Sequence, residues 1–228
     1  MPLEVNSRNN DSEQGNEAYG PPLHGQPKFI ANIKRRVAPG VATQKEILAV
    51  EVNMKIEKAI SELNRTRTPI SALQAPSDSG VYAFYLKHHS RIKGFRAGDD
   101  GLIYIGSTSN LAKRICRKHF NFKCTGSSTL RRSLGAILKK ELALVAIPRS
   151  PGASKAYKFS SDGEQRLTDW MKENLEVGVC PIRSDYESIE KQLLTKLQPI
   201  LNLKGRDKPD LEALRKMCAE EAKQNRAA

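Results

Sequence analysis

Glu190 is a carboxylate within a segment whose neighbours at helical spacing are apolar. Residues 185–197 repeat large side chains at three- and four-residue intervals, which predicts an amphipathic helix. Its predicted apolar face carries Tyr186, Glu190, Leu193, Leu194 and Leu197. An unpaired carboxylate on such a face is unfavourable, so Glu190 needs a metal ion, an arginine or hydrogen-bond donors. The helix alone favours a structural ion pair over a metal site.

Two tyrosines, Tyr82 and Tyr104, lie in short β-type segments that also contain glycine. Residues 80–87 (GVYAFYLK) and 102–106 (LIYIG) flank a Gly-rich turn, which predicts an antiparallel hairpin. Tyrosine is common in strands, so packing explains each of the two residues when it is taken alone.

Four fragments, taken together in their order, resemble the GIY-YIG nucleases of excision repair, homing and restriction. They are GVY at residues 80–82, YIG at 104–106, Arg114 ten residues after Tyr104, and residues 190–202 (EKQLLTKLQPILN). The last fragment has the family's glutamate, apolar pair, proline and asparagine. The resemblance spans residues 77–206 of the 228.

The resemblance implies a DNA endonuclease that hydrolyses phosphodiester bonds with one Mg²⁺ or Mn²⁺ and no organic cofactor. Tyr82 would help to deprotonate the attacking water, and Tyr104 would form hydrogen bonds in the same site. Arg114 would bind the scissile phosphate, Glu190 the metal, and Asn202 would orient the site. One carboxylate suits Mg²⁺, which retains most of its waters. A phenol is a weak base at neutral pH, because its ordinary pKa is about 10.

His119 fits the resemblance imperfectly. Many relatives have a histidine or tyrosine before a phenylalanine, four residues after the arginine, whereas His119 lies five after Arg114 and Lys118 takes the family's position. Either a slip of one residue near the helix end brings His119 into the site as a proton shuttle or phosphate ligand, or His119 is a surface residue.

The chain is strongly basic, with 38 lysines and arginines against 25 aspartates and glutamates and a net charge of +13. This balance favours a polyanionic partner, and with the resemblance it predicts DNA. The expected phosphate contacts are Lys113, Arg117, Lys118, Arg131 and Arg132.

The four cysteines form neither a C-x-x-C pair nor a dense disulfide pattern, which predicts a reducing, cytoplasmic location. Cys116, His119 and Cys124 are too irregularly spaced to favour zinc. No apolar run approaches the length of a membrane helix, so no membrane partner is expected. The oligomeric state stays open.

The predicted elements form an α+β fold with a small mixed, mainly antiparallel sheet sandwiched by helices. Capping-box spacing begins helices at Thr43 and Ser161. Further helices are expected near residues 110–120, 129–140, 185–197 and from 209, and strands near 141–147, 157–159 and 177–182.

The domain organisation follows from these elements. Residues 1–42 are expected to be disordered, 43–76 to form an amphipathic helix and linker, 77–206 to form the nuclease domain, and 207–228 to form a charged C-terminal helix.

Two other functions stay open. One is a nucleic-acid-binding or regulatory module on the same fold with weak or no catalysis, and the other is a basic RNA- or ribosome-associated protein.

Overall fold

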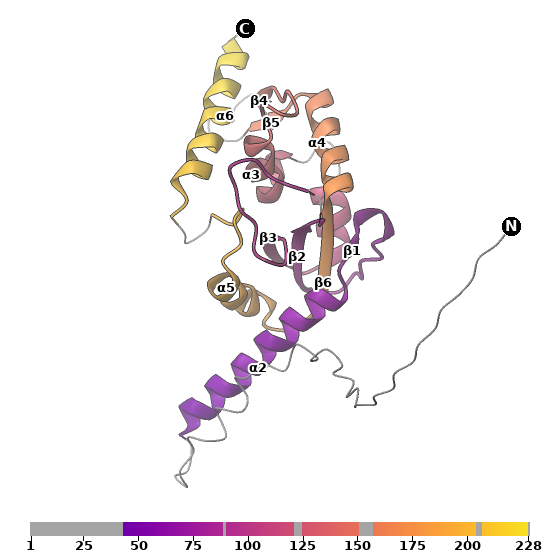
Figure 1. Cartoon of the computed structure of the whole chain (residues 1–228), viewed down its shortest axis with the longest axis vertical. Helices are drawn as coiled ribbons and strands as arrows, with labels where there is room; N and C mark the ends of the chain where they lie inside the picture. Colours follow the sequence, from indigo (N-terminus) through magenta and orange to yellow (C-terminus); the bar gives the residue numbers. More distant parts are fainter. Residues whose placement is uncertain (1–42, 89, 121–124, 151–156, 204–206, 228) are drawn as a thin grey trace, which may run out of the picture. The chain divides into compact units, whose positions relative to one another are not determined.

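An antiparallel sheet forms the centre of the protein, as shown by a computed structural model that describes residues 43–88, 90–120, 125–150, 157–203 and 207–227. The predicted disordered segment 1–42 lies outside these residues. The strand order is β1-β6-β2-β3, and every neighbouring pair is antiparallel (Figure 1). The strands are β1 (Thr68–Pro69), β2 (Gly80–Leu86), β3 (Leu102–Thr108) and β6 (Leu175–Pro181).

Helices cover both faces of this sheet. On one face, α2 (Gln44–Arg65) and α5 (Tyr186–Leu197) pack on Val81, Ala83 and Ile105. The other face is covered by η2 (Lys113–His119), α3 (Thr129–Ile137) and α4 (Ser161–Asn174). The predicted α+β fold, an antiparallel sheet between helices, is therefore confirmed.

The C-terminal helix α6 (Pro209–Ala227) packs against α3 and against β4 (Ala146–Pro148). Leu211, Cys218 and Ala222 are buried on its inner side and join the core that contains both tyrosines of the hairpin. α6 therefore contributes to the same core as the sheet, although most of its surface is charged.

The predicted strand 141–147 is largely wrong. Residues 139–143 form a turn after α3, in which the N–H of Leu142 bonds to the carbonyl of Leu138 and the N–H of Leu144 to that of Lys139. Ala143 ends this turn with a φ of 47°, and only β4 pairs, with β5 (Tyr157–Phe159). A short apolar run resembles a strand in sequence, but here its leucines pack on the core from a turn and do not alternate across a sheet.

Two smaller expectations also change. The linker expected between the first helix and residue 77 contains β1 and a short 3₁₀ helix, η1 (Ile70–Ala72). The cap of α4 is Ser160 and not Ser161, because the Ser160 hydroxyl accepts a hydrogen bond from the N–H of Gly163. Among the helices that the structure describes, none is both long and apolar enough to span a membrane.

Candidate active site

The β2–β3 hairpin places Tyr82 and Tyr104 on one face of the sheet. Its register pairs Tyr82 with Gly106 and Phe84 with Tyr104, so the two tyrosines lie on neighbouring strands with their rings 6.3 Å apart. Both rings are buried in the core.

Gly106 makes room for the ring of Tyr82. A β-carbon at Gly106 would lie 2.4 Å from the Tyr82 hydroxyl oxygen and 2.5 Å from Cζ. Such distances lie far inside van der Waals contact, so any larger residue would displace the ring. The glycine of the YIG fragment therefore fixes where the first tyrosine's hydroxyl can lie.

Arg114 and His119 meet at that hydroxyl because η2 is a π-helix. The Asn110 side chain caps the preceding turn by accepting from the N–H of Lys113 at 2.7 Å, and the chain then continues with π geometry through His119. Hydrogen bonding from residue i to i+5 aligns residues five apart, as Arg114 and His119 are. The π geometry therefore places His119, and not Lys118, on the same side of the helix as Arg114, and Lys118 is exposed.

The Tyr82 hydroxyl is shared between these two side chains. Nε of Arg114 donates to it at 3.1 Å, and Nε2 of His119 lies 2.9 Å away. His119 is fully buried, and its Nδ1 lies 2.8 Å from the hydroxyl of Ser128. The structure therefore contradicts the interpretation of His119 as a surface residue.

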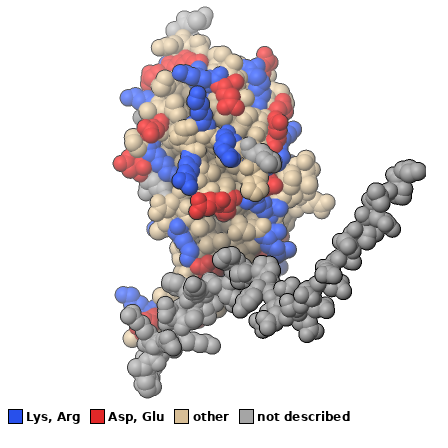
Figure 2. Space-filling view, in the orientation of Figure 1, with Lys and Arg blue, Asp and Glu red and all other residues tan. Residues whose placement is uncertain are grey.

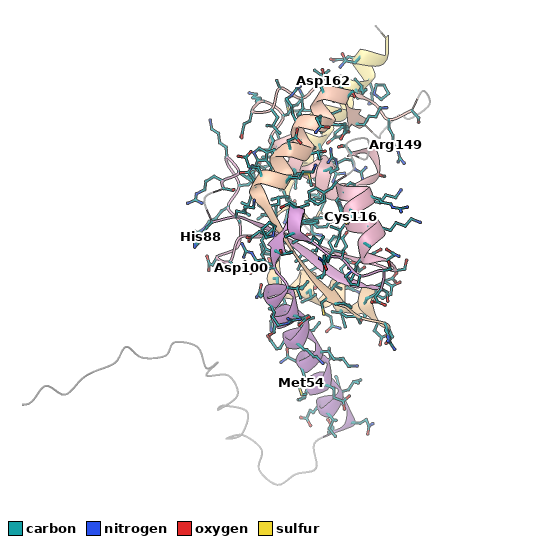
Figure 3. All side chains as sticks on the ribbon, turned by 90° about the vertical axis from the view of Figure 1, so that its right-hand side faces the viewer. Met54, His88, Asp100, Cys116, Arg149 and Asp162 are labelled. Carbon is teal, nitrogen blue, oxygen red and sulfur yellow. The ribbon has the colours of Figure 1, made fainter. Side chains whose placement is uncertain are left out.

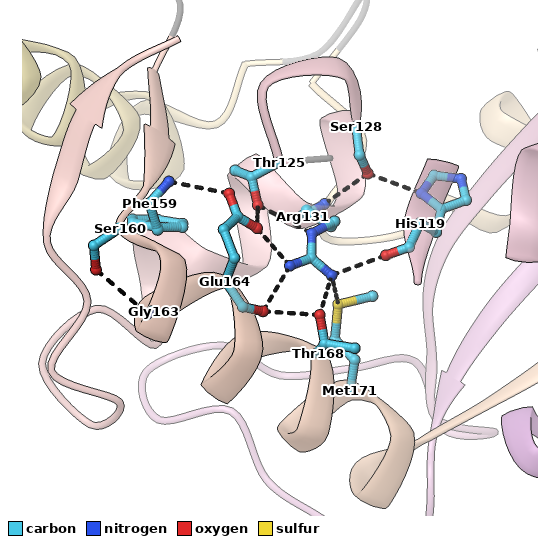
Figure 4. A network of polar contacts seen from close by, with 10 residues as sticks. All are labelled: His119, Thr125, Ser128, Arg131, Phe159, Ser160, Gly163, Glu164, Thr168 and Met171. Carbon is cyan, nitrogen blue, oxygen red and sulfur yellow. Dashed lines mark hydrogen bonds and ion pairs between the residues drawn. The ribbon is translucent and has the colours of Figure 1, made fainter. Parts of the chain in front are cut away.

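Arg131 holds the segment that carries His119. Its guanidinium donates to the His119 carbonyl at 2.9 Å and forms an ion pair with Glu164 at 2.6 Å (Figure 4). Thr125 and Thr168 accept further hydrogen bonds from the same group. The arginine thus uses donors on all three nitrogens within the protein interior.

The expectation that Arg131 contacts DNA phosphate is therefore wrong. Its side chain is completely buried and its charge is matched by Glu164, which is equally inaccessible. The sequence could not separate this residue from its neighbour Arg132, because consecutive helix positions point in different directions and only packing decides which is inside.

Glu190 lies at the margin of the buried face of α5 and not at its centre. Ile189 and Leu193 are the buried residues of that helix, whereas Glu190 is half-buried. Its Oε2 accepts a hydrogen bond from the Ser107 hydroxyl at 2.6 Å, and its charge acts on both Tyr82 and Tyr104. The carboxylate thus lies within electrostatic reach of the tyrosine pair.

Asn202 is a clamp on the edge of the sheet. Its side-chain oxygen accepts from the N–H of Ile105 at 3.0 Å, and its amide nitrogen donates to the Ile105 carbonyl at 2.7 Å. β3 is the last strand in the sheet order, so Asn202 supplies the bonds that a further strand would make. It orients Tyr104 and Ser107 through the backbone of β3.

Burial sets the protonation of the central groups. It raises the pKa of Tyr82 and of Tyr104, with Arg114 opposing it in both cases, so both phenols are neutral at neutral pH. Burial, followed by the charges of Arg114 and Arg131, lowers the pKa of His119 well below its ordinary value. The resting site therefore combines neutral phenols, a neutral imidazole and one charged guanidinium.

The donor set fits magnesium better than zinc. No group of three or more His, Cys, Asp or Glu side chains that could hold a metal occurs among the described residues. Both ring nitrogens of His119 already contact hydroxyls, Cys116 is exposed, and Cys124 lies outside the described residues. One half-buried carboxylate, Glu190, suits a Mg²⁺ that keeps most of its water ligands.

The other predicted phosphate contacts have different surroundings. Lys113, Arg117 and Lys118 are exposed on η2, and Arg132 is partly buried on α3. Basic and acidic side chains are interspersed over the face shown in Figure 2. The net charge alone therefore does not mark one DNA-binding surface on that face.

Sequence reasoning missed two hydroxyls of the site, Ser107 and Ser128. Ser107 directly follows the YIG fragment, and this position at the end of the strand that carries Tyr104 was the available signal. Ser128 caps α3 by accepting from the N–H of Arg131 at 3.1 Å. Its contact with His119 depends on tertiary structure and has no sequence signal.

Comparison with known proteins gives one match. Residues 80–225 match the family model described as a GIY-YIG catalytic domain. Neither the search of curated proteins nor the search of solved structures found a match.

Proposed function

The chain belongs to the GIY-YIG catalytic domain family, and we propose that it is a metal-dependent endonuclease that hydrolyses DNA phosphodiester bonds. Membership indicates a nuclease-type hydrolase. The metal, the DNA substrate and the role of each residue are the proposal, and the cytoplasmic location stays a prediction.

The observation that carries this proposal is the shared hydroxyl of Tyr82. It lies between the guanidinium of Arg114 and the imidazole of His119, at 3.1 and 2.9 Å. A tyrosine that served only for packing would need neither partner. Bringing a cation, a phenol and a neutral imidazole together in a buried site favours proton transfer next to a bound anion.

Arg114 is suited to bind the scissile phosphate. In the part of the chain that the structure describes, no carboxylate forms an ion pair with it. Although burial opposes the effect, the two tyrosines raise its pKa above the ordinary value, so the guanidinium stays charged. Its remaining donors can stabilise the negative charge that grows on a pentacovalent phosphate.

Tyr82 and His119 can carry the proton of the attacking water. In the tautomer with the proton on Nδ1, His119 donates a hydrogen bond to the Ser128 hydroxyl. Its Nε2 then accepts a hydrogen bond from the Tyr82 hydroxyl. Tyr82 then gives its proton to Nε2 as its oxygen receives one from water. The raised phenol pKa and the lowered imidazole pKa oppose this transfer at rest. The charge of Arg114 favours loss of the proton from Tyr82 but opposes its uptake by His119.

Glu190 would hold the divalent ion. A Mg²⁺ bound there would neutralise phosphate charge and acidify a water ligand. The hydrogen bond from Ser107 fixes one carboxylate oxygen, which sets the direction of the other. Asn202 acts one step further away, because it positions the strand that carries Ser107 and Tyr104.

Cleavage of several DNA forms tests the proposal. Supercoiled plasmid, single-stranded DNA and a branched duplex would be incubated with Mg²⁺ or with EDTA. We expect cleavage of at least one form with Mg²⁺ and none with EDTA. Glu190→Gln should abolish cleavage because the metal ligand loses its charge. Glu187→Gln, an exposed change on the same helix, should cut like the wild type.

The alternative function gives a different result. A binding or regulatory module would shift the same DNA in a gel without cutting it, at any Mg²⁺ concentration. Cleavage that continues in Glu190→Gln would contradict the assigned metal ligand, and an absence of cleavage in all three substrates would contradict the enzyme.

A further inference from the structure

An arginine, Arg215, interrupts the buried stripe of α6. It follows Leu211 by four residues and precedes Cys218 by three, so it lies on the same side as these buried residues. The Arg215 side chain is itself half-buried. Lys139 and Glu221 form an ion pair at 2.8 Å where α6 meets α3, whereas Arg215 has no carboxylate partner among the described residues.

Arg132 on α3 is partly buried and has no carboxylate partner among the described residues. Its Nε is inaccessible to solvent and has no hydrogen-bond partner. The contrast with its neighbour Arg131 is clear, because Arg131 is paired with Glu164 and bonded on every nitrogen. Buried donors are almost always satisfied in folded proteins, so Arg132 lacks the compensation that Arg131 receives from its partners.

Arg149 approaches the same place from the end of β4. Its aliphatic chain lies across Gly126, where a β-carbon would be 2.8 Å from its Cγ and Cδ. Gly126 thus provides the surface along which this exposed arginine extends. In Figure 3, Arg149 lies on the opposite side of the molecule from His88, which lines a separate pocket at the β2–β3 connection.

Arg215, on the helix that packs against α3, and Arg149 both lie near enough to Arg132 to act on its charge. Burial and then the charges of Arg215 and Arg149 lower the pKa of Arg132, while Tyr157 and Tyr104 oppose this effect. Tyr104 belongs to the candidate active site, so Arg132, within the arginine cluster of Arg132, Arg149 and Arg215, lies within electrostatic reach of that site. Gathering unpaired like charges is unfavourable unless an anion neutralises them.

We infer that the arginine cluster is a phosphate-binding subsite that takes a DNA backbone phosphate next to the one that is cut. This inference rests on the proposed function for the identity of the DNA and for the neighbouring cut. Guanidinium groups match phosphate geometry with paired donors. A phosphate bound by the accessible guanidinium groups of this cluster would relieve the repulsion between Arg132 and Arg215.

Binding of a labelled DNA duplex in EDTA tests the subsite without requiring cleavage. The variants are Arg215→Met, which keeps an unbranched side chain on the buried stripe, and Lys216→Met, which removes the same charge from the next, exposed position of α6. We expect Arg215→Met to weaken binding about 3- to 10-fold and to lower the slope of log Kd against log salt by roughly 1. Lys216→Met should change the affinity and slope less.

Thermal unfolding separates a ligand site from a structural role. Because Arg215 is repelled by Arg132, Arg215→Met should unfold at the same temperature as the wild type or higher. A structural arginine would instead leave the variant less stable. Equal affinity and equal salt slopes for the Arg215→Met and Lys216→Met variants would overturn the inference, as would a large loss of stability in the Arg215→Met variant alone.

Inorganic phosphate distinguishes a free anion from the DNA backbone. Stabilisation of the wild type by phosphate, together with an unchanged DNA salt slope in Arg215→Met, would overturn the assignment to DNA. If the wild type cuts no DNA but binds it through Arg215, the proposed nuclease function fails and the phosphate subsite stands. If it cuts DNA and binding is independent of Arg215, only the subsite fails.

Discussion

Replacing Gly106 by alanine should disable the site while leaving the fold intact. The new methyl group would lie 2.4 Å from the Tyr82 hydroxyl, and ordinary contact begins at about 3.4 Å. The backbone of β2, which carries Tyr82, is held by pairing with both β3 and β6. The hydroxyl end of the ring must therefore move by about 1 Å. That movement separates the hydroxyl from Arg114 and His119.

The size of the effect follows from this displacement. Misplacing a reacting group by about 1 Å can lower a rate about a hundredfold. Overpacking in a core typically costs about 1–3 kcal/mol of the free energy of unfolding. A decrease in stability of that size leaves most molecules folded. The loss of cleavage activity should therefore be larger than the unfolded fraction can explain.

Gly135→Ala is the matched control. Its methyl group would lie 2.3 Å from the ring of Phe159, which is a similar overlap with an aromatic ring away from Tyr82. Initial cleavage rates with Mg²⁺ would be measured at a temperature where urea unfolding shows both variants to be folded. Equal rates for the two alanine variants, or wild-type activity in Gly106→Ala, would refute the reasoning.

Three further predictions concern the groups that support the site. Glu164→Gln should reduce the free energy of unfolding by about 3–5 kcal/mol, because it leaves the buried charge of Arg131 unmatched; a loss below about 1 kcal/mol in urea unfolding would contradict this. Asn202→Ala should cost about 1–3 kcal/mol, because it removes both hydrogen bonds to the backbone of Ile105, and wild-type stability on thermal unfolding would count against the clamp. Stability should fall as the pH drops below about 6.5, because His119 has a lowered pKa when folded and takes a proton mainly in the unfolded chain; His119→Gln should flatten this dependence, and an unchanged pH profile would contradict it.

The β2–β3 hairpin was predictable because its signals are local. Alternating strand residues on either side of a Gly-rich turn fix the pairing, and the pairing places Tyr82 and Tyr104 on one face. The helix from Gln44 followed from capping-box and apolar spacing, and the helix from Tyr186 from apolar spacing alone. The strand predicted at 141–147 failed because apolar residues in a turn after a helix resemble a short strand.

Spacing in the sequence was a poor guide to the helix that carries Arg114 and His119. A four-residue rule for an α-helix favours Lys118, whereas the π-helix η2 presents His119 to the Tyr82 hydroxyl. Local sequence gives little indication of a π turn, because its extra residue is held by packing and by the contact of His119 with Ser128.

The sequence by itself determined the chemical groups of the candidate site and the strands and helices that carry them. Tyr82, Tyr104 and Glu190 could be named because residue type, spacing and strand alternation are properties of the chain. Only the tertiary structure decided which basic residues are buried in ion pairs and which are accessible. Arg131 and Arg132 are adjacent in the sequence, yet one is matched by Glu164 and the other faces further arginines. Burial and charge pairing depend on segments distant in the chain, and no local pattern encodes them.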